Sequence, residues 1–194
     1  MRTAVVERIT NETKVNISLD LDGTGTYQIN TGVGFFDHML SHTAKHGLLN
    51  LQLAAQGDLE VDPHHTVEDV GLLFGQALKE ALGNKVGINR YGCATIPMDE
   101  ALAMVVVDLG GRPYLRFQAE LGKGQLGNFD LELVPEFFQA VSVQAGMNIH
   151  VRLLDGTNLH HAVEAIYKAF GRALAEAVKL NERITDVPST KGML

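Results

Sequence analysis

The sequence has little of what secreted, membrane-spanning or disulfide-bonded proteins need. It contains a single cysteine, Cys93, which excludes an internal disulfide framework, and we expect this side chain to be a small buried residue. No apolar run approaches the roughly 18 residues of a membrane span. The N-terminal stretch also lacks the basic and apolar segments of a signal peptide. The cytoplasm is therefore the expected compartment, and no contact with a membrane is expected.

Basic residues are also scarce. There are 16 Lys and Arg against 23 Asp and Glu, which gives a formal net charge of −7, and the cations are scattered along the chain. This balance argues against a nucleic-acid partner. Hydrophobic residues make up 45% of the 194 residues, which is enough to form a core. A globular protein is therefore the starting hypothesis.

Histidine, in contrast, is clustered, and one motif occurs twice. Residues 64–68 read HHTVE and residues 160–164 read HHAVE. In a helix, these spacings place two imidazoles and one carboxylate near the same face. A lone histidine at a helix start is more often a cap or a satisfied polar residue, but two matched copies favour a metal site. Such ligands suit Mn, Fe, Zn or Ni, and two equivalent clusters raise the possibility of a two-metal site.

The spacing of apolar residues predicts alternating strands and helices. Strands are expected at residues 3–8 and 14–21 as an antiparallel pair, at 26–30 pairing back on them, and at 49–53, 59–61, 101–108, 114–120 and 148–153. Helices are expected at residues 35–47 with Gly47 as the cap, at 70–83 with the first histidine motif on the first turn, and at 133–146 and 160–178.

This order of elements is repeated, which indicates an internal duplication. Aligning the halves sets His38 against Glu136, and residues 75–78 against residues 171–174. We therefore predict one domain, residues 1–194, built from two repeats of about 1–92 and 93–194. His38, His42 and His46 are four residues apart and form one polar stripe on the helix at 35–47.

Several motifs together resemble one known family over nearly the whole chain. They are FFDHML at 35–40, DPHHTVED at 62–69, PMDEA at 97–101, GRP at 111–113, HHAVEAIYKAF at 160–170 and PSTKG at 188–192. In combination they are similar to the imidazoleglycerol-phosphate dehydratases of histidine biosynthesis. The resemblance implies a hydro-lyase that converts D-erythro-imidazole-glycerol phosphate to imidazole-acetol phosphate.

The resemblance also implies the architecture and the partners. The fold would be α/β (α+β) and duplicated, each half a four-stranded sheet packed on a helix pair, of the ribosomal protein S5 domain 2-like type. Family members use two Mn(II) ions per active site, and they form homo-oligomers of 24 subunits built from trimers. Their sites lie at subunit interfaces. Each histidine motif would then supply half of a ligand set that a neighbouring subunit completes.

Site residues follow from the resemblance position by position. The implied metal ligands are His38, His64, His65, Glu68, Glu136, His160, His161 and Glu164. Members often have a histidine where this chain has Glu136. The implied catalytic carboxylates are Glu12, Glu68 and Glu164. Glu12 is the candidate acid or base, although the sequence alone favours a solvated glutamate at a strand end.

The implied substrate-binding residues are Glu12, His38, His46, His64, His65, Glu68, Arg90, Arg112, His160, Lys168, Ser189, Thr190 and Lys191. Among them, Arg90, Arg112, Lys168, Ser189 and Lys191 match the family's phosphate and substrate positions, because cations with donors suit that group. Thr190 keeps the hydroxyl of a serine that is common there. His42 replaces a frequent glutamine, and we expect packing or support roles for His42 and His150.

Chemistry explains why such a site needs a metal. The proton to be removed lies beside an imidazole ring rather than a carbonyl, so it is only weakly acidic. A ring held as a metal-bound imidazolate could expel the adjacent hydroxyl, and a general base would then take the proton. Two other classes remain open: a non-catalytic metal-storage or structural assembly, and a metallohydrolase with a bridging hydroxide as nucleophile.

Overall fold

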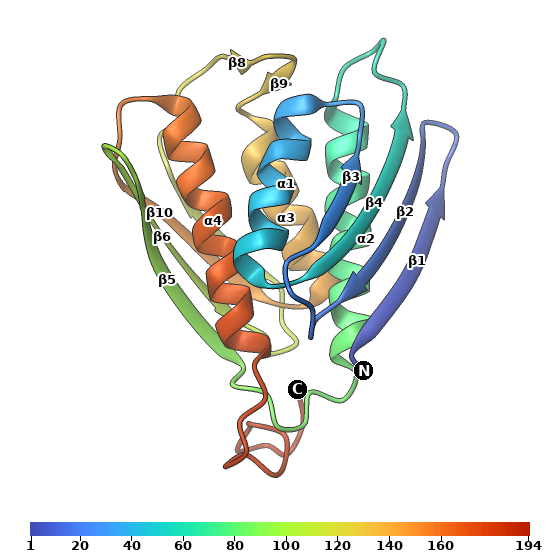
Figure 1. The fold of residues 1–194 in the computed structure, drawn as a ribbon, viewed down its shortest axis with the longest axis vertical. Helices are drawn as coiled ribbons and strands as arrows, with labels where there is room; N and C mark the ends of the chain where they lie inside the picture. The colour runs from blue at the N-terminus through green and yellow to red at the C-terminus, as the bar shows by residue number, and fades with distance from the viewer.

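Two four-stranded sheets lie on the outside of the molecule, and four helices lie between them (Figure 1). The computed structural model describes residues 1–194. The helices form two pairs, each with one helix from either half of the chain. In one pair α1 (Gly34–Gly47) packs on α4 (Leu159–Val178), and in the other α2 (His64–Leu82) packs on α3 (Leu133–Ala145). This mixed α/β arrangement confirms the predicted fold class.

The first half contains six elements. They are β1 (Thr3–Ile9), β2 (Thr13–Asp20), β3 (Tyr27–Asn30), α1 (Gly34–Gly47), β4 (Asn50–Gly57) and α2 (His64–Leu82). The strands form a sheet in the order β1-β2-β4-β3. Val15, Ile17 and Leu19 alternate with polar residues along β2, and all three are buried. The alternation of the sequence thus directs one face of this sheet toward the helices.

The second half repeats this order and adds one small hairpin. Its elements are β5 (Tyr91–Met98), β6 (Ala101–Asp108), β7 (Tyr114–Gln118), β8 (Gln125–Leu126), β9 (Phe129–Asp130), α3 (Leu133–Ala145), β10 (Asn148–Asp155) and α4 (Leu159–Val178). The larger sheet has the order β5-β6-β10-β7, which matches the first sheet strand for strand. The duplication is therefore visible in the topology, and the predicted repeat boundary between residues 92 and 93 falls two residues after the start of β5.

Glycines let the paired helices approach closely. A Cβ atom at Gly171 of α4 would lie 2.6 Å from the backbone oxygen of Thr43 in α1. A Cβ atom at Gly75 of α2 would lie 2.8 Å from the backbone oxygen of Val141 in α3. Gly75 and Gly171 are the glycines that the sequence alignment of the halves sets against each other. The two crossings are thus equivalent, and both exclude a side chain.

Two strand predictions need correction, and one strand has no counterpart among the predictions. Residues 59–61 form a turn rather than a strand. The strand near residues 26–30 does not pair back on the first two strands, because β3 pairs in parallel with β4. The strand β5 was not predicted, since Gly92 and Pro97 interrupt its pattern. As the edge strand of its sheet, β5 can accommodate a proline that a central strand could not.

Two single-residue predictions are also wrong. The left-handed residue that ends α1 is Leu48, with φ 55°, rather than Gly47. A Cβ atom at Gly47 would lie 3.2 Å from the backbone oxygen of Gly171, so this glycine serves the helix crossing. Cys93 is exposed rather than buried, because it alternates with the buried Gly92 along the edge strand β5. None of the four helices is both long and apolar enough to cross a membrane.

Replacing Gly171 by alanine should destabilise the protein by about 1–3 kcal/mol, because an added methyl group must displace the backbone of α1. Thermal and denaturant unfolding of the purified protein would measure the loss. Gly34→Ala is the matched control, since a Cβ atom at Gly34 meets nothing within 4 Å. Equal unfolding free energies for the two variants would contradict the proposed close crossing.

Candidate functional site

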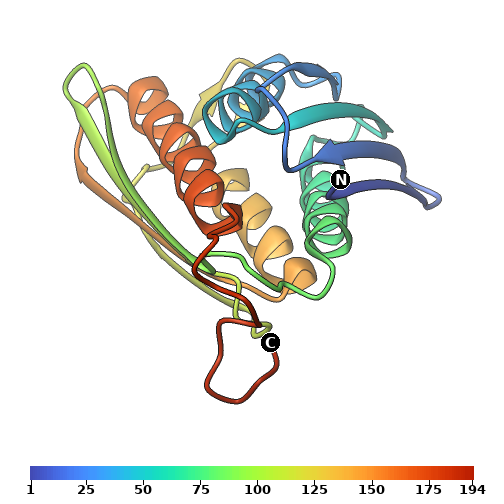
Figure 2. The same cartoon turned by 60° about the horizontal axis from the view of Figure 1, so that its bottom comes forward.

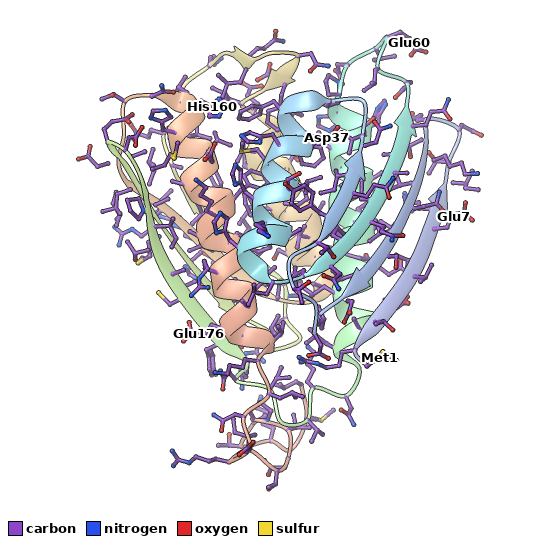
Figure 3. The ribbon with its side chains drawn as sticks, in the orientation of Figure 1. Met1, Glu7, Asp37, Glu60, His160 and Glu176 are labelled. Atoms are coloured by element: carbon purple, nitrogen blue, oxygen red, sulfur yellow. The ribbon has the colours of Figure 1, made fainter.

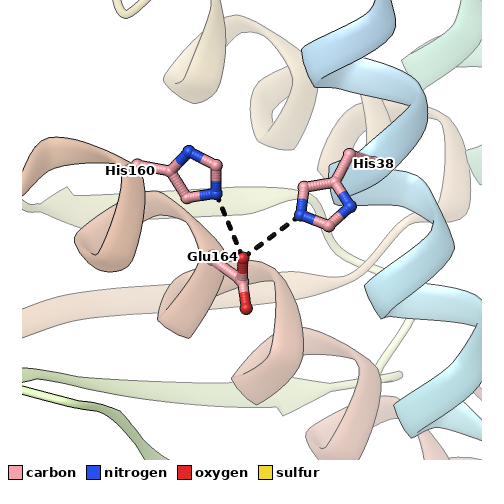
Figure 4. A group of neighbouring side chains, drawn as sticks. All are labelled: His38, His160 and Glu164. Atoms are coloured by element: carbon pink, nitrogen blue, oxygen red, sulfur yellow. Dashed lines mark hydrogen bonds and ion pairs between the residues drawn. The ribbon is translucent and has the colours of Figure 1, made fainter.

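Three potential metal ligands converge where the first turns of α1 and α4 meet. Nε2 of His160 lies 3.2 Å from Oε2 of Glu164, and Nε2 of His38 lies 3.3 Å from the same oxygen (Figure 4). One ligand atom from each residue lies within 4.8 Å of the other two. The structure therefore brings together residues 126 positions apart in the sequence.

A side-chain cap begins α4, and a hydrogen bond from outside the helix anchors the first turn of α1. The side chain of Asn158 accepts hydrogen bonds from the backbone N–H groups of His160 and His161, which begins α4 at the motif. Asp37 accepts hydrogen bonds from the backbone N–H and the hydroxyl of Thr31, at 2.8 and 2.6 Å, and so fixes the start of α1. Figure 3 shows Asp37 and His160 at the same end of the helix layer, and Glu176 near the other end of α4.

Glu164 is held as a carboxylate. Its side chain is only 7% exposed, and Nζ of Lys168 pairs with Oε1 at 2.5 Å. Burial opposes ionisation, but the Lys168 hydrogen bond and the nearby imidazoles outweigh it and hold the pKa of Glu164 at about 2. Because Lys168 occupies Oε1, the second oxygen remains directed at the histidines.

His42, for which the sequence predicts a packing or support role, contacts this group. Its Nε2 lies 3.3 Å from Nε2 of His38 and 3.4 Å from Oε2 of Glu164. Burial lowers the pKa of His42 to about 4, so its ring is neutral at physiological pH. His46, one turn further along α1, stacks on His42 with ring centroids 5.8 Å apart.

The first histidine motif forms a second, looser group at the start of α2. His64 and Glu136 line a cavity of about 220 Å³ together with Asp62 and Asp130. Glu68 is exposed, one turn further along α2. These positions are equivalent to those of His160, His38 and Glu164 in the duplication. The two ligand groups therefore occupy matching places at the two helix contacts, α1 with α4 and α2 with α3.

The second histidine of each motif contacts a carboxylate outside the ligand groups described above. Nδ1 of His65 lies 3.0 Å from Oδ2 of Asp58, and Nδ1 of His161 lies 2.7 Å from Oε2 of Glu100. Both carboxylates raise the pKa of the histidine that they contact. A carboxylate on Nδ1 fixes the ring orientation and leaves Nε2 for a metal. Glu12 is close to this pair, with Oε2 3.8 Å from Nδ1 of His65.

The predicted phosphate residues gather at the C-terminal segment. A cavity of about 600 Å³ is lined by Arg90, Arg112, Ser189, Thr190 and Lys191, with neighbouring residues of the tail. The guanidinium group of Arg90 is already engaged, because Nε and Nη2 donate to Asp108 at 2.7 and 3.2 Å and Nη1 donates to the backbone oxygen of Pro188. Arg112 and Lys191 are left as the cations available to an anion.

The anion cavity and the histidine groups lie at opposite ends of the molecule. The backbone N–H of Arg90 donates to the oxygen of Ala177, at the last turn of α4, whereas His160 lies on the first turn. With 20 residues, α4 is about 30 Å long. Figure 2 brings the end with the C-terminal segment forward. Lys168, in contrast, lies beside Glu164. One chain therefore does not unite all of the predicted substrate residues.

Several residues that support the site carry no signal in the sequence. Asp58, Glu100 and Asp108 are distant in sequence from the side chains that they hold, and no pattern indicates them. His42 does carry a signal, because it lies four residues after His38 on the same stripe, and the sequence predicts a packing or support role for it.

The donor chemistry of the group at His38 fits a divalent metal ion. Neutral imidazole nitrogen and ionised carboxylate oxygen are the forms that bind such ions, and they are the forms that burial and Lys168 favour here. The only side chains that contact Oε2 of Glu164 are the imidazoles of His38, His42 and His160. A His/Glu cluster that could bind a metal is therefore present within a single protomer.

Known proteins resemble this chain over its whole length. A sequence model of the imidazoleglycerol-phosphate dehydratase family matches residues 31–174. The imidazoleglycerol-phosphate dehydratase of Desulfitobacterium hafniense is 56% identical, covering 100% of this chain and 99% of its own. That of Streptococcus mutans is 58% identical and covers 100% of both chains.

Solved structures of this family have the same fold. The crystal structure of the enzyme from Staphylococcus aureus has a TM-score of 0.83 at 46% identity, covering 92% of this chain and 99% of its own. The enzyme from Pyrococcus furiosus, solved in complex with (S)-C348, has a TM-score of 0.85 at 35% identity, covering 97% and 100%. With its duplicated fold and its paired histidine motifs, the chain thus belongs to the imidazoleglycerol-phosphate dehydratase family, which are hydro-lyases of histidine biosynthesis.

Proposed function

We propose that this protein dehydrates D-erythro-imidazole-glycerol phosphate to imidazole-acetol phosphate in the cytoplasm, with two Mn(II) ions per active site. We further propose that its sites lie between subunits of a 24-subunit homo-oligomer built from trimers. The observation that carries the second proposal is the separation, over the length of α4, of the histidine groups from the anion cavity. The substrate carries an imidazole ring and a phosphate. Its binding therefore requires a histidine group and an anion cavity.

In this assembly, each substrate molecule would be bound by the anion cavity of one protomer and by the histidine groups of another. Arg112 and Lys191 would bind the phosphate, with hydroxyl groups from Ser189 and Thr190, while Arg90 would keep the tail in place through Pro188. At the other end, His38, His64, His160 and His46 would surround the imidazole ring. Lys168 would hold the carboxylate of Glu164 in the orientation that its ligand role requires.

The proposed metal ligands are His38, His64, His65, Glu68, Glu136, His160, His161 and Glu164. Bound there, divalent ions would supply Lewis acidity, which stabilises the ring as the imidazolate that can expel the neighbouring hydroxyl. The carboxylates that hold Nδ1 of His65 and His161 would leave each Nε2 free for a metal. Neither residue belongs to the group of mutually close ligands within one protomer, which supports ligation across a subunit contact.

The side chains near His65 suggest how the proton leaves. The carboxylate of Glu12 is 56% exposed and lies at the turn between β1 and β2, 3.8 Å from Nδ1 of His65. It could therefore reach a substrate bound beside that imidazole and accept the proton from carbon as the general base. Glu68 and Glu164 are the other carboxylates that we assign to the reaction.

The reaction itself gives the first test. Purified protein, stripped of metal and reloaded with Mn(II), should convert imidazole-glycerol phosphate to imidazole-acetol phosphate, which product analysis by mass spectrometry would detect. A storage protein or a metallohydrolase with the same ligands would form no acetol product. Failure to form it with any divalent metal would exclude the proposed activity.

A second test concerns the ligands. His65→Ala and His161→Ala should each lower the bound metal, and the double variant should lose it together with the larger assembly, because each removes an imidazole that a carboxylate orients. Elemental analysis and light scattering would measure both effects. His150→Ala is the control, since this exposed histidine on β10 lies outside both groups. A double variant that retains two ions per site would overturn the ligand set.

A third test concerns the phosphate. Lys191→Ala should raise KM about 10- to 100-fold, because a hydrogen bond to a charged group contributes about 1.5–3 kcal/mol. Lys123→Ala is the matched control, because this exposed lysine lies outside the cavity.

Arg112→Lys keeps the positive charge but loses the planar guanidinium group, which can donate two parallel hydrogen bonds. This variant should therefore also weaken binding of the phosphate. Steady-state kinetics with unchanged KM for Lys191→Ala and Arg112→Lys would place the phosphate elsewhere.

A further inference from the structure

Glu12 has a counterpart in the second half of the chain that makes different contacts. The β1–β2 and β5–β6 pairs have the same register, which sets Glu12 against Glu100 at the turn between the two strands. Glu100 contacts Nδ1 of His161 and accepts hydrogen bonds from two backbone N–H groups of the loop before α4. In the first half, Asp58 holds the equivalent ring instead, and the carboxylate of Glu12 is 56% exposed.

A buried carboxylate of α2 anchors the turn that carries this exposed glutamate. Asp69 is only 7% exposed, and it accepts a hydrogen bond from Nε of Arg8 on β1 at 2.7 Å and another from the hydroxyl of Thr13 on β2. When the two histidine motifs are aligned, the residue of α4 equivalent to Asp69 is Ala165, which can make neither contact. The anchor is therefore specific to the half in which the turn glutamate is exposed.

Hydroxyl groups connect this anchor to the backbone of Glu12. The hydroxyl oxygens of Thr13 and Thr10 lie 3.2 Å apart, and that of Thr10 accepts hydrogen bonds from the backbone N–H groups of Glu12 and Thr13 at 3.1 and 2.9 Å. The backbone N–H of Thr10 donates to the oxygen of Thr13 at 2.9 Å, which closes the turn. A continuous series of hydrogen bonds thus joins Asp69 to Glu12.

The burial of this series differs from that of the carboxylate that it supports. Thr13 is 4% exposed and Asp69 is 7% exposed, so their hydrogen bonds are shielded from water. The backbone of the turn is consequently fixed relative to α2, whereas the side chain of Glu12 remains accessible beside His65. A group that must meet a substrate at a defined distance requires this combination.

We infer that Asp69 is a positioning residue, which holds the turn of Glu12 against the first turns of α2. The inference rests on the proposed role of Glu12 as the general base, but the anchor itself involves neither a metal nor the substrate. Asp69 contacts no reacting atom and acts on the reaction only through Glu12. Loss of the anchor therefore lowers kcat and leaves KM, the bound metal and the assembly unchanged.

Asp69→Asn and Thr13→Val each break the series at a different point with little change in side-chain size. Each should lower kcat about 10- to 100-fold, because a displacement of about 1 Å causes a loss of that order. Thr13→Ser keeps the hydroxyl and should retain turnover. Asp22→Asn is the matched control, since Asp22 also pairs with an arginine, Arg2, but at the other end of the β1–β2 pair.

Double variants with Glu12→Gln show whether the effect passes through Glu12. Asp69→Asn and Thr13→Val should each cause no further loss of kcat in the Glu12→Gln background, because residues that act in one series are not additive. An equal loss in both backgrounds would overturn the inference and leave Asp69 with a role in the fold alone. Unchanged kcat in the single variants, or a fall in bound metal by elemental analysis, would also overturn it.

Hydrogen–deuterium exchange gives a measure that needs no turnover. The peptide that covers residues 8–14 should exchange faster in Asp69→Asn and in Thr13→Val than in the wild type, and Asp22→Asn should match the wild type there. Unchanged exchange in both variants would overturn the anchor, whatever happens to turnover. Product formation by the wild type is measured separately, so failure of the dehydratase proposal would leave this comparison intact.

Discussion

The crossing of α1 with α4 is the contact on which the site depends. Gly171 has no side chain, and the backbone of α1 at Thr43 occupies that space, so the two helices run closer than ordinary side chains permit. His38 therefore reaches Glu164 across the gap at 3.3 Å. The equivalent glycine, Gly75, sets the same approach between α2 and α3, where Glu136 and His64 line a common cavity. The close packing of the helix backbones thus sets the distances within both ligand groups.

Electrostatic balance around Glu164 depends in turn on that packing. A buried carboxylate would ordinarily bind a proton, but Lys168 reaches it from the next turn of the same helix and keeps it charged. Enclosure also lowers the pKa of His42, which leaves its ring neutral. The partially dry environment thus opposes charge on both groups, and Lys168 with the nearby imidazoles keeps the Glu164 carboxylate ionised beside a neutral nitrogen.

The sequence predicted the order of most elements because apolar alternation in β2 and β6 and the helical spacing in α2 and α4 are strong. It failed where tertiary contacts decide, as at β5, whose proline is acceptable only at a sheet edge. The histidine motifs identified the ligand candidates, and the resemblance named the family. Neither could reveal that Asp58 and Glu100 hold His65 and His161, because chain folding alone brings those residues together.

The separation of the anion cavity from the histidine groups also constrains how protomers can associate. In the assembly that we propose, the tail of one protomer must approach the helix starts of another, so the two contacting surfaces are different. Such a contact is heterologous, and its repetition closes into a ring when the rotation between neighbours allows. A threefold ring satisfies this condition, whereas a twofold dimer of like surfaces does not. Because the two sites lie at opposite ends of α4, the proposed assembly requires contacts between unlike surfaces of neighbouring protomers.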